Sequence, residues 1–147
     1  MKIKLLGLAF VCALAAAAPS VASGPPIAAR ILAVGKTQAT TIDVKAGTTV
    51  LDSIKIAPGG SFGWHTHGSP VAVVVTAGTL TVFDPTVAGC APVKVSKGQS
   101  FVEPANHVHL ARNDGKTPVT VYALYLGLPK PSAANSVASE PAGCNQQ

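Results

Sequence analysis

From residue 31 onward, the chain alternates apolar and polar residues or runs briefly apolar, in short segments rich in Val, Ile and Thr. This period is typical of β-strands, whose successive side chains point to opposite faces of a sheet. The pattern predicts strands at Ile31–Val34, Thr40–Val44, Thr49–Ile56, Val71–Val75, Thr79–Phe83, Val93–Val95, Ser100–Glu103, Val108–Arg112 and Val119–Leu126.

Turn-forming residues separate nearly every pair of these segments. They are Pro58-Gly59-Gly60, Ala77-Gly78, Asp84-Pro85, Lys97-Gly98, Pro104-Ala105-Asn106 and Asn113-Asp114-Gly115. No window with helical periodicity occurs outside the first 23 residues. Many short strands at regular spacing predict an all-β sandwich or barrel, and a chain of 147 residues has room for one such domain.

The first residues have a different pattern. Lys2 and Lys4 precede an apolar run from Leu5 to Ala18, and small residues follow it. We interpret residues 1–23 as a secretory signal peptide cleaved near Ala22 or Ser23, so we expect a secreted or periplasmic protein. The apolar run is short for a membrane span, and no second one follows, so the mature protein is expected to have none.

This interpretation gives three parts: the signal peptide at 1–23, a β-barrel domain at 24–128 and a low-complexity tail at 129–147. The tail is rich in Ala, Ser, Pro and Asn and has few large apolar residues. We therefore expect it to be mobile unless Cys144 ties it to the domain.

Charge argues against a nucleic-acid partner. The chain has 11 basic and 6 acidic residues, a net charge of +5 at pH 7. Loss of Lys2 and Lys4 with the signal peptide leaves 9 basic residues and a net charge of +3. Because no basic run or stripe remains, we expect no nucleic-acid binding.

The cysteines are even in number after cleavage. Cys12 lies in the predicted signal peptide, which leaves Cys90 and Cys144. An exported protein meets conditions that permit disulfides. A bond between these two would close a loop of roughly 55 residues and stabilise the fold by about 4 kcal/mol in the chain-entropy model. Two free thiols are the alternative, and we favour the disulfide.

All four histidines fall in two His-x-His pairs, His65 with His67 and His107 with His109. Side chains two residues apart on a strand share a face, so each pair can direct both rings at one point. Neutral imidazole is the commonest protein ligand of divalent transition metals. The pairs predict a metal site if they meet in the fold.

The spacing around both pairs resembles the two sequence motifs of the cupins. The first motif is matched by Gly59, His65, His67 and Gly78. The second is matched by Gly98, Pro104, His109 and Asn113. The resemblance implies a double-stranded β-helix, or jelly-roll barrel, in which the motif strands pair antiparallel. It also implies that His65, His67 and His109 together bind a divalent metal, and that the protein forms a homodimer.

Two positions depart from the motifs. Val71 stands where the first motif has a glutamate ligand, and Asn106 replaces a glycine of the second, which Asn tolerates because it adopts positive φ. Three neutral imidazoles leave the charge of the metal uncompensated. We therefore expect Fe, Ni, Cu or Zn rather than carboxylate-preferring Mn, with positions open for a small ligand.

Two neighbouring polar residues have ordinary interpretations. His107 falls in the turn before a motif strand, so we favour solvent exposure over a fourth ligand or a proton shuttle. Glu103 is the only carboxylate within either motif. We expect it to be solvated at a strand end rather than to act as a catalytic acid.

Apolar residues near the histidines are expected to pack. Val71, Val73 and Val75 would share the inward face with the histidines and give the site dry walls. Phe62, Trp64 and Phe101 could line a pocket, but aromatic residues beside a barrel core more often pack, and alternation directs Trp64 away from the metal.

These residues leave two functions open. One is an exported metal-dependent enzyme, of oxygenase type, acting on a small organic molecule through His65, His67 and His109. The other is a non-catalytic module of the cell envelope that binds a small ligand or a metal. Open metal positions favour the enzyme, whereas the scarcity of inward acid or base residues favours the binder. Motifs for nucleotide binding or nucleophilic hydrolysis are absent from the sequence.

Overall fold

The computed structural model describes residues 28–145. The chain divides into a first unit of residues 1–30 and a second of residues 31–147, and the fold below is that of the second. The predicted signal peptide lies outside the described residues. Within the part described, no helix is long and apolar enough to cross a membrane.

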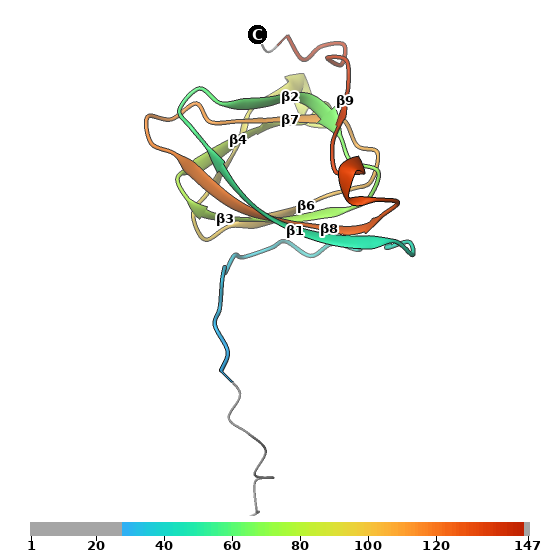
Figure 1. Ribbon diagram of the computed structural model, residues 1–147. Helices are drawn as coiled ribbons and strands as arrows, with labels where there is room; N and C mark the ends of the chain where they lie inside the picture. Colours follow the sequence, from blue (N-terminus) through green and yellow to red (C-terminus); the bar gives the residue numbers. More distant parts are fainter. Residues whose placement is uncertain (1–27, 146–147) are drawn as a thin grey trace, which may run out of the picture. The chain divides into compact units, whose positions relative to one another are not determined.

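Two antiparallel sheets form the second unit. One has the order β1-β8-β3-β6, with β1 Thr48–Ile56, β8 Val119–Leu128, β3 Val71–Ala77 and β6 Ser100–Glu103. The other has the order β5-β4-β7-β2-β9, with β5 Val93–Ser96, β4 Thr79–Phe83, β7 His109–Arg112, β2 Ser61–Thr66 and β9 Ser136–Val137. Figure 1 shows β2 and β7 facing β3, β6 and β8 across the barrel. The predicted all-β jelly-roll fold is confirmed, and the only helical turns between residues 28 and 145 are Ala88–Cys90 and Pro131–Ala133.

Most predicted strands are present, but the two N-terminal ones are wrong. Residues Ile31–Val34 and Thr40–Val44 are irregular, and the only pairing there is an isolated parallel bridge between Lys36 and Gln99. Ile31 is 79% exposed. Alternation indicates which face of a strand would be buried, but it does not provide a sheet edge to pair with.

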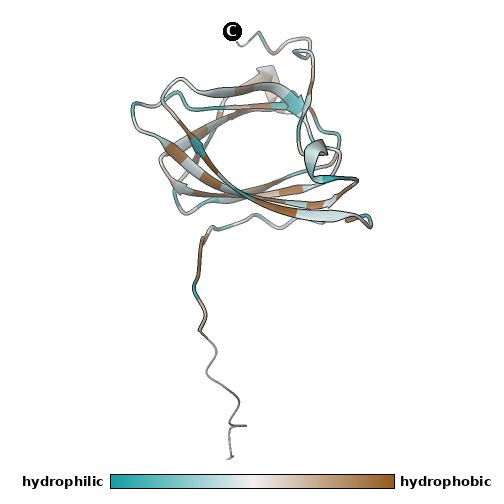
Figure 2. Ribbon diagram, viewed as in Figure 1, coloured by the Kyte–Doolittle hydropathy of each residue, from teal (hydrophilic) through white to brown (hydrophobic). Residues whose placement is uncertain are grey.

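The core lies between the sheets. Alternate residues of β3 and β8 point inward and are buried, among them Val71, Val75, Val119 and Val121. Figure 2 shows the resulting mixture of hydrophobic and hydrophilic positions along these strands. Val71 and Val75 lie on the inward face together with Val73, as predicted. This packing fixes the register of β3, and therefore of its neighbour β6.

The C-terminal residues are attached to the barrel by a disulfide between Cys90 and Cys144, which confirms the predicted bond. Both cysteines are buried beside Phe83 and Leu110, and Trp64 packs against the same cluster, as expected. Strand β9 also pairs with β2. Cys144 therefore ties the tail to the domain, which was the expected exception to a mobile tail. The tail also reaches β2, the strand that carries His65 of the first histidine pair.

Candidate metal centre

The histidines meet through the pairing of β2 with β7. His65 in β2 lies directly opposite His109, the first residue of β7, and His67 follows one residue after the end of β2. Directly opposed residues of an antiparallel pair project to the same face. All three side chains are buried, with 6%, 2% and 2% of His65, His67 and His109 exposed. The pairing expected from the resemblance is confirmed.

Each ring is held by a hydrogen bond from its Nδ1 to a backbone carbonyl. His65 donates to Gly63 over 2.9 Å, and His109 donates to His107 over 3.0 Å. His67 donates to Ala134, in the C-terminal tail, over 2.7 Å. A carbonyl can only accept, so the proton of each neutral ring lies on Nδ1 and the lone pair on Nε2. This is the arrangement in which a second bond orients a metal-binding histidine.

The three rings converge. A ring nitrogen from each of the three histidines lies within 4.8 Å of the others. The ring centroids of His65 and His109 are 4.3 Å apart, and His67 is 4.9 and 5.0 Å from these two. The Nε2 atoms of His67 and His109 are buried and have no hydrogen-bond partner. Buried lone pairs without a partner are costly, and a divalent cation would satisfy them, so these residues fit a metal.

The position of Glu103 corrects the expectation of a solvated residue. The residue is only 8% exposed, and its carboxylate lies against two of the three histidines. One carboxylate oxygen is 2.9 Å from Nε2 of His109, and the other is 3.1 Å from Nε2 of His67. Glu103 is the last residue of β6, and packing of that strand against β3 turns it inward. Its burial follows from non-local pairing, which its place before Pro104 does not indicate.

The surroundings shift the protonation of the cluster. Burial lowers the pKa of His65 to about 4, so this ring is neutral at pH 7. Burial opposes ionisation of Glu103, but its contacts with His109 and His67 outweigh burial and lower its pKa to about 2. Burial alone would lower the pKa of His109, but the adjacent carboxylate raises it. A neutral His65 and an ionised Glu103 are both in the state that binds metals.

A small cavity of about 30 Å³ adjoins the cluster. Apolar side chains including Val73 and Val121 line it together with His65, His67 and Glu103. This volume is roughly that of one water molecule in the liquid. Of the three valines predicted to form dry walls, only Val73 lines this cavity, and other apolar side chains complete the wall. Both Phe62 and Phe101 border the cavity, and Phe101 also packs against the core.

Two contributions to the site were missed from the sequence. Tyr125 of β8 lines the cavity, with its ring 5.4 Å from that of His67. Burial raises the pKa of its phenol. The alternation of β8 could have placed Tyr125 inward, since it shares the buried face of Val121 and Ala123. The carbonyl of Ala134 had no comparable signal, because every residue has a backbone carbonyl and the sequence does not indicate which one will accept a hydrogen bond.

The fourth histidine lies apart from the other three. His107 occupies the loop before β7, and its Nε2 is 3.0 Å from Oδ1 of Asp84. Its side chain is 23% exposed, so the expected solvent exposure is only partial. His107 is not a member of the converging group. Its backbone carbonyl nevertheless contributes, because it accepts the Nδ1 proton of His109.

The turn after Pro104 links the two motifs. Asn106 has a φ of 60°, in the left-handed region that the motif glycine would occupy, as expected for Asn. Its backbone N–H donates to the carbonyl of His67 over 2.7 Å. Replacement of the glycine by Asn therefore preserves the turn that brings the second motif against the first.

Comparison with known proteins agrees with this architecture. The family profile described as "Cupin domain" matches residues 53–125. The chain belongs to the cupin superfamily. No curated protein matches it in sequence.

Solved structures with the same fold are distant in sequence. A DMSP lyase, DddQ, from Ruegeria pomeroyi DSS-3 is 16% identical with a TM-score of 0.53, over 63% of this chain and 44% of the lyase. The polyketide cyclase RemF from Streptomyces resistomycificus is 21% identical with a TM-score of 0.51, over 65% of each chain. The chain thus spans less than half of the lyase. At these identities the likeness concerns the fold alone.

Proposed function

We propose that this protein is an exported, metal-binding cupin in which His65, His67 and His109 hold a divalent transition metal, and that it acts as a metal-dependent enzyme on a small organic molecule. The observation that carries the proposal is the set of three buried rings, each fixed through Nδ1 and each with a ring nitrogen within 4.8 Å of those of the other two. Three imidazoles favour Fe, Ni, Cu or Zn.

The residues around the proposed centre suit a small substrate. A metal bound here would supply Lewis-acid or redox chemistry, and an oxygenase-type reaction is our leading candidate. Val73 and Val121 keep water away, which strengthens electrostatic interactions within the site. The Tyr125 phenol, beside His67, is placed to orient a substrate by hydrogen bonding. The lyase and cyclase that share this fold support small-molecule chemistry in general, without indicating a particular reaction.

Metal analysis tests the centre directly. The mature protein should bind one equivalent of Fe, Ni, Cu or Zn, and His67→Ala or His109→Ala should abolish stoichiometric binding because each removes one of three ligands. His107→Ala is the matched control, since it also deletes an imidazole but lies outside the converging group. A wild-type protein that binds no divalent transition metal would refute the centre.

A second candidate function is a non-catalytic module that binds a metal or a small ligand. It is favoured by the cavity of about 30 Å³, which is far smaller than the roughly 300 Å³ or more of typical ligand pockets. Oxygen uptake by the iron-loaded protein, measured over small carboxylates, thiols and diketones, separates the two. Substrate-dependent uptake that is lost in His109→Ala supports the enzyme. Stoichiometric metal with no uptake and no product supports the binder.

Export and dimerisation belong to the same proposal. Export is supported by the pattern of residues 1–23, and it agrees with the disulfide between Cys90 and Cys144. Cell fractionation with mass spectrometry of the N-terminus should find a protein that begins near Gly24. The homodimer rests on the family resemblance, and light scattering of the mature protein should give twice the mass of the chain.

A further inference from the structure

We propose that Glu103 is the fourth ligand of this metal centre, and that it supplies from β6 the carboxylate that the cupin motif places on β3. The inference rests on the proposed metal function and adds a ligand to it. It reverses the interpretation in which Val71 leaves the site without an acidic donor.

The strand register explains how the carboxylate could change position. Val71 and Glu103 are directly paired across the antiparallel strands β3 and β6. Side chains of such a pair share a face, with Cβ atoms about 5 Å apart. A carboxylate moved from position 71 to position 103 therefore stays on the inward face at the same depth of the barrel. Val71, which is 1% exposed, then fills the space with an apolar side chain.

The distances match coordination to a common ion. Metal bonds of about 2.1 Å to imidazole and carboxylate place adjacent ligand atoms of an octahedron about 3.0 Å apart. The carboxylate oxygens of Glu103 lie 2.9 Å from Nε2 of His109 and 3.1 Å from Nε2 of His67. Both contacts have the length of an octahedral edge.

The absence of a hydrogen bond at either Nε2 is consistent with coordination. At an octahedral edge, the neighbouring ligand lies about 45° away from the direction of the nitrogen lone pair, so a proton there would point past the oxygen. Accordingly, Nε2 of His67 and of His109 has no hydrogen-bond partner, although each lies close to a carboxylate oxygen. A direct imidazole–carboxylate hydrogen bond would instead align the proton with the oxygen.

Electrostatics also favour a cation at this point. Because Nδ1 of each ring donates to a carbonyl, a neutral ring at His67 or His109 presents its lone pair toward the Glu103 carboxylate. Lone pairs and anionic oxygens about 3 Å apart repel each other in a buried site. A divalent ion placed between them would be bound by the nitrogen lone pairs and by the carboxylate oxygens, and would remove this repulsion.

A fourth, anionic ligand changes the preferred metal. A carboxylate cancels one unit of the metal charge and adds a hard oxygen donor, which suits Mn as well as Fe. We therefore expect the wild-type protein to bind Mn, contrary to the preference predicted from three histidines alone, and Glu103→Gln to lose Mn more severely than Ni or Zn.

The test returns the carboxylate from position 103 to position 71. Mn, Ni and Zn affinities are measured by titration calorimetry for the wild type, Glu103→Gln, Glu103→Val and the double variant Val71→Glu/Glu103→Val. Each single variant should weaken Mn binding by at least about tenfold, and the double variant should recover most of that loss. Circular dichroism and thermal melting of the metal-free proteins identify any variant that does not fold.

A second measurement does not depend on mutant folding. In a crystal structure of the metal-loaded wild type, a Glu103 oxygen should lie within bonding distance of the ion. Metal held by the histidines with Glu103 beyond bonding distance, or Glu103→Gln binding Mn as tightly as the wild type, would overturn the inference while leaving the three-histidine centre intact. A wild type that binds no metal would instead refute the centre itself.

Discussion

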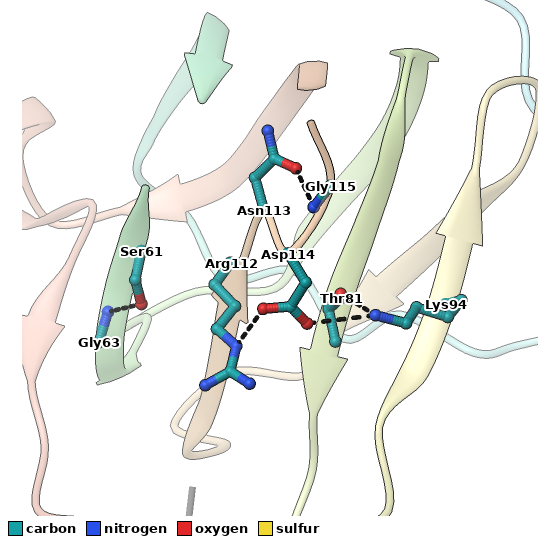
Figure 3. A network of polar contacts seen from close by, with 8 residues as sticks. All are labelled: Ser61, Gly63, Thr81, Lys94, Arg112, Asn113, Asp114 and Gly115. Carbon is teal, nitrogen blue, oxygen red and sulfur yellow. Dashed lines mark hydrogen bonds and ion pairs between the residues drawn. The ribbon is translucent and has the colours of Figure 1, made fainter. Parts of the chain in front are cut away.

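Two polar clusters at opposite ends of β7 differ in how their charges are satisfied. At the outer end, Arg112 donates to one oxygen of Asp114 over 2.6 Å, and Lys94 contacts the other at 3.1 Å. Lys94 also donates to Thr81 over 2.6 Å. Figure 3 shows these groups arranged around the Asp114 carboxylate. We call Thr81, Lys94, Arg112 and Asp114 the outer cluster.

The inner cluster, which comprises His65, His67, His109 and Glu103, lacks this balance. Its hydrogen-bond donors are directed away from its centre, toward backbone carbonyls. Its centre contains lone pairs and an anionic carboxylate. In the outer cluster every anion faces a cation or a donor, so the group is complete as it stands. A bound cation would complete the inner cluster, which is the difference expected between a metal-binding polar group and a structural one.

The largest expected effect is the response of the two clusters to metal. A metal that binds only the folded state, at a free concentration about 100 times its dissociation constant, adds about 2.7 kcal/mol of stability. For a domain of this size that raises Tm by roughly 10 °C. We expect this increase, measured by differential scanning calorimetry against a chelator-treated sample, in the wild type and in Asp114→Asn.

The same increase should be absent in His67→Ala. An equal increase in His67→Ala would mean that the metal binds elsewhere, and loss of the increase in Asp114→Asn would mean that the two clusters are not independent.

The next effect concerns the C-terminal tail, which reaches the inner cluster. Replacing Cys90 and Cys144 by Ser should lower the free energy of unfolding by about 2 to 4 kcal/mol, measured by urea denaturation. Release of the tail should also weaken the hydrogen bond from His67 to the Ala134 carbonyl, so we expect metal affinity to fall by about tenfold or more. A stability loss without any change in metal affinity would show that Ala134 does not help to orient His67.

The sequence predicted the site better than its surroundings. His65, His67 and His109 lie in motifs whose spacing encodes both a turn and a strand pairing, so the convergence of these three residues could be predicted from the sequence alone. Glu103 was assigned to solvent because its burial depends on register with Val71, a contact between strands about thirty residues apart. Local alternation contains no information on which strand becomes the neighbour of which.

The same limit explains the errors at the ends of the domain. Ile31–Val34 has the composition of a strand, but most of its side chains are exposed. Conversely, β9 is only two residues long and was not predicted, yet it pairs with β2. Composition identifies segments that are able to pair, whereas the topology decides which of them do.

A smaller effect is the pH dependence of the metal-free protein. Burial lowers the pKa of His65 from the usual 6.5 to about 4, so the unfolded chain binds more protons between these pH values. The free energy of unfolding should therefore fall as pH decreases from 6.5 toward 4, by at most about 1.4 kcal/mol per pH unit from this group. Denaturation of His65→Gln over pH 4.5 to 6.5 should show a shallower slope than the wild type. Parallel slopes would contradict the burial of a neutral ring, and the range stays above the acidic region where the lowered pKa of Glu103 contributes.

The smallest expected effect comes from the outer cluster itself. Asp114→Asn keeps the size of the side chain but removes the charge that faces Arg112 and Lys94, and its pairs are 26% to 52% exposed on the cationic side. Exposed ion pairs contribute about 0.2 to 1 kcal/mol each and are screened by salt. We expect the free energy of unfolding, measured by urea denaturation, to fall by about 1 kcal/mol or less, and by still less at high ionic strength.

Asp114 is the better residue to change, because Arg112 also stacks on the Phe83 ring at 4.6 Å and its replacement would disturb packing. A loss of several kcal/mol that persists at high salt would mean that the charge of Asp114 contributes strongly to stability. The outer cluster would then not be an ordinary surface group of ion pairs, and the contrast with the inner cluster would be wrong.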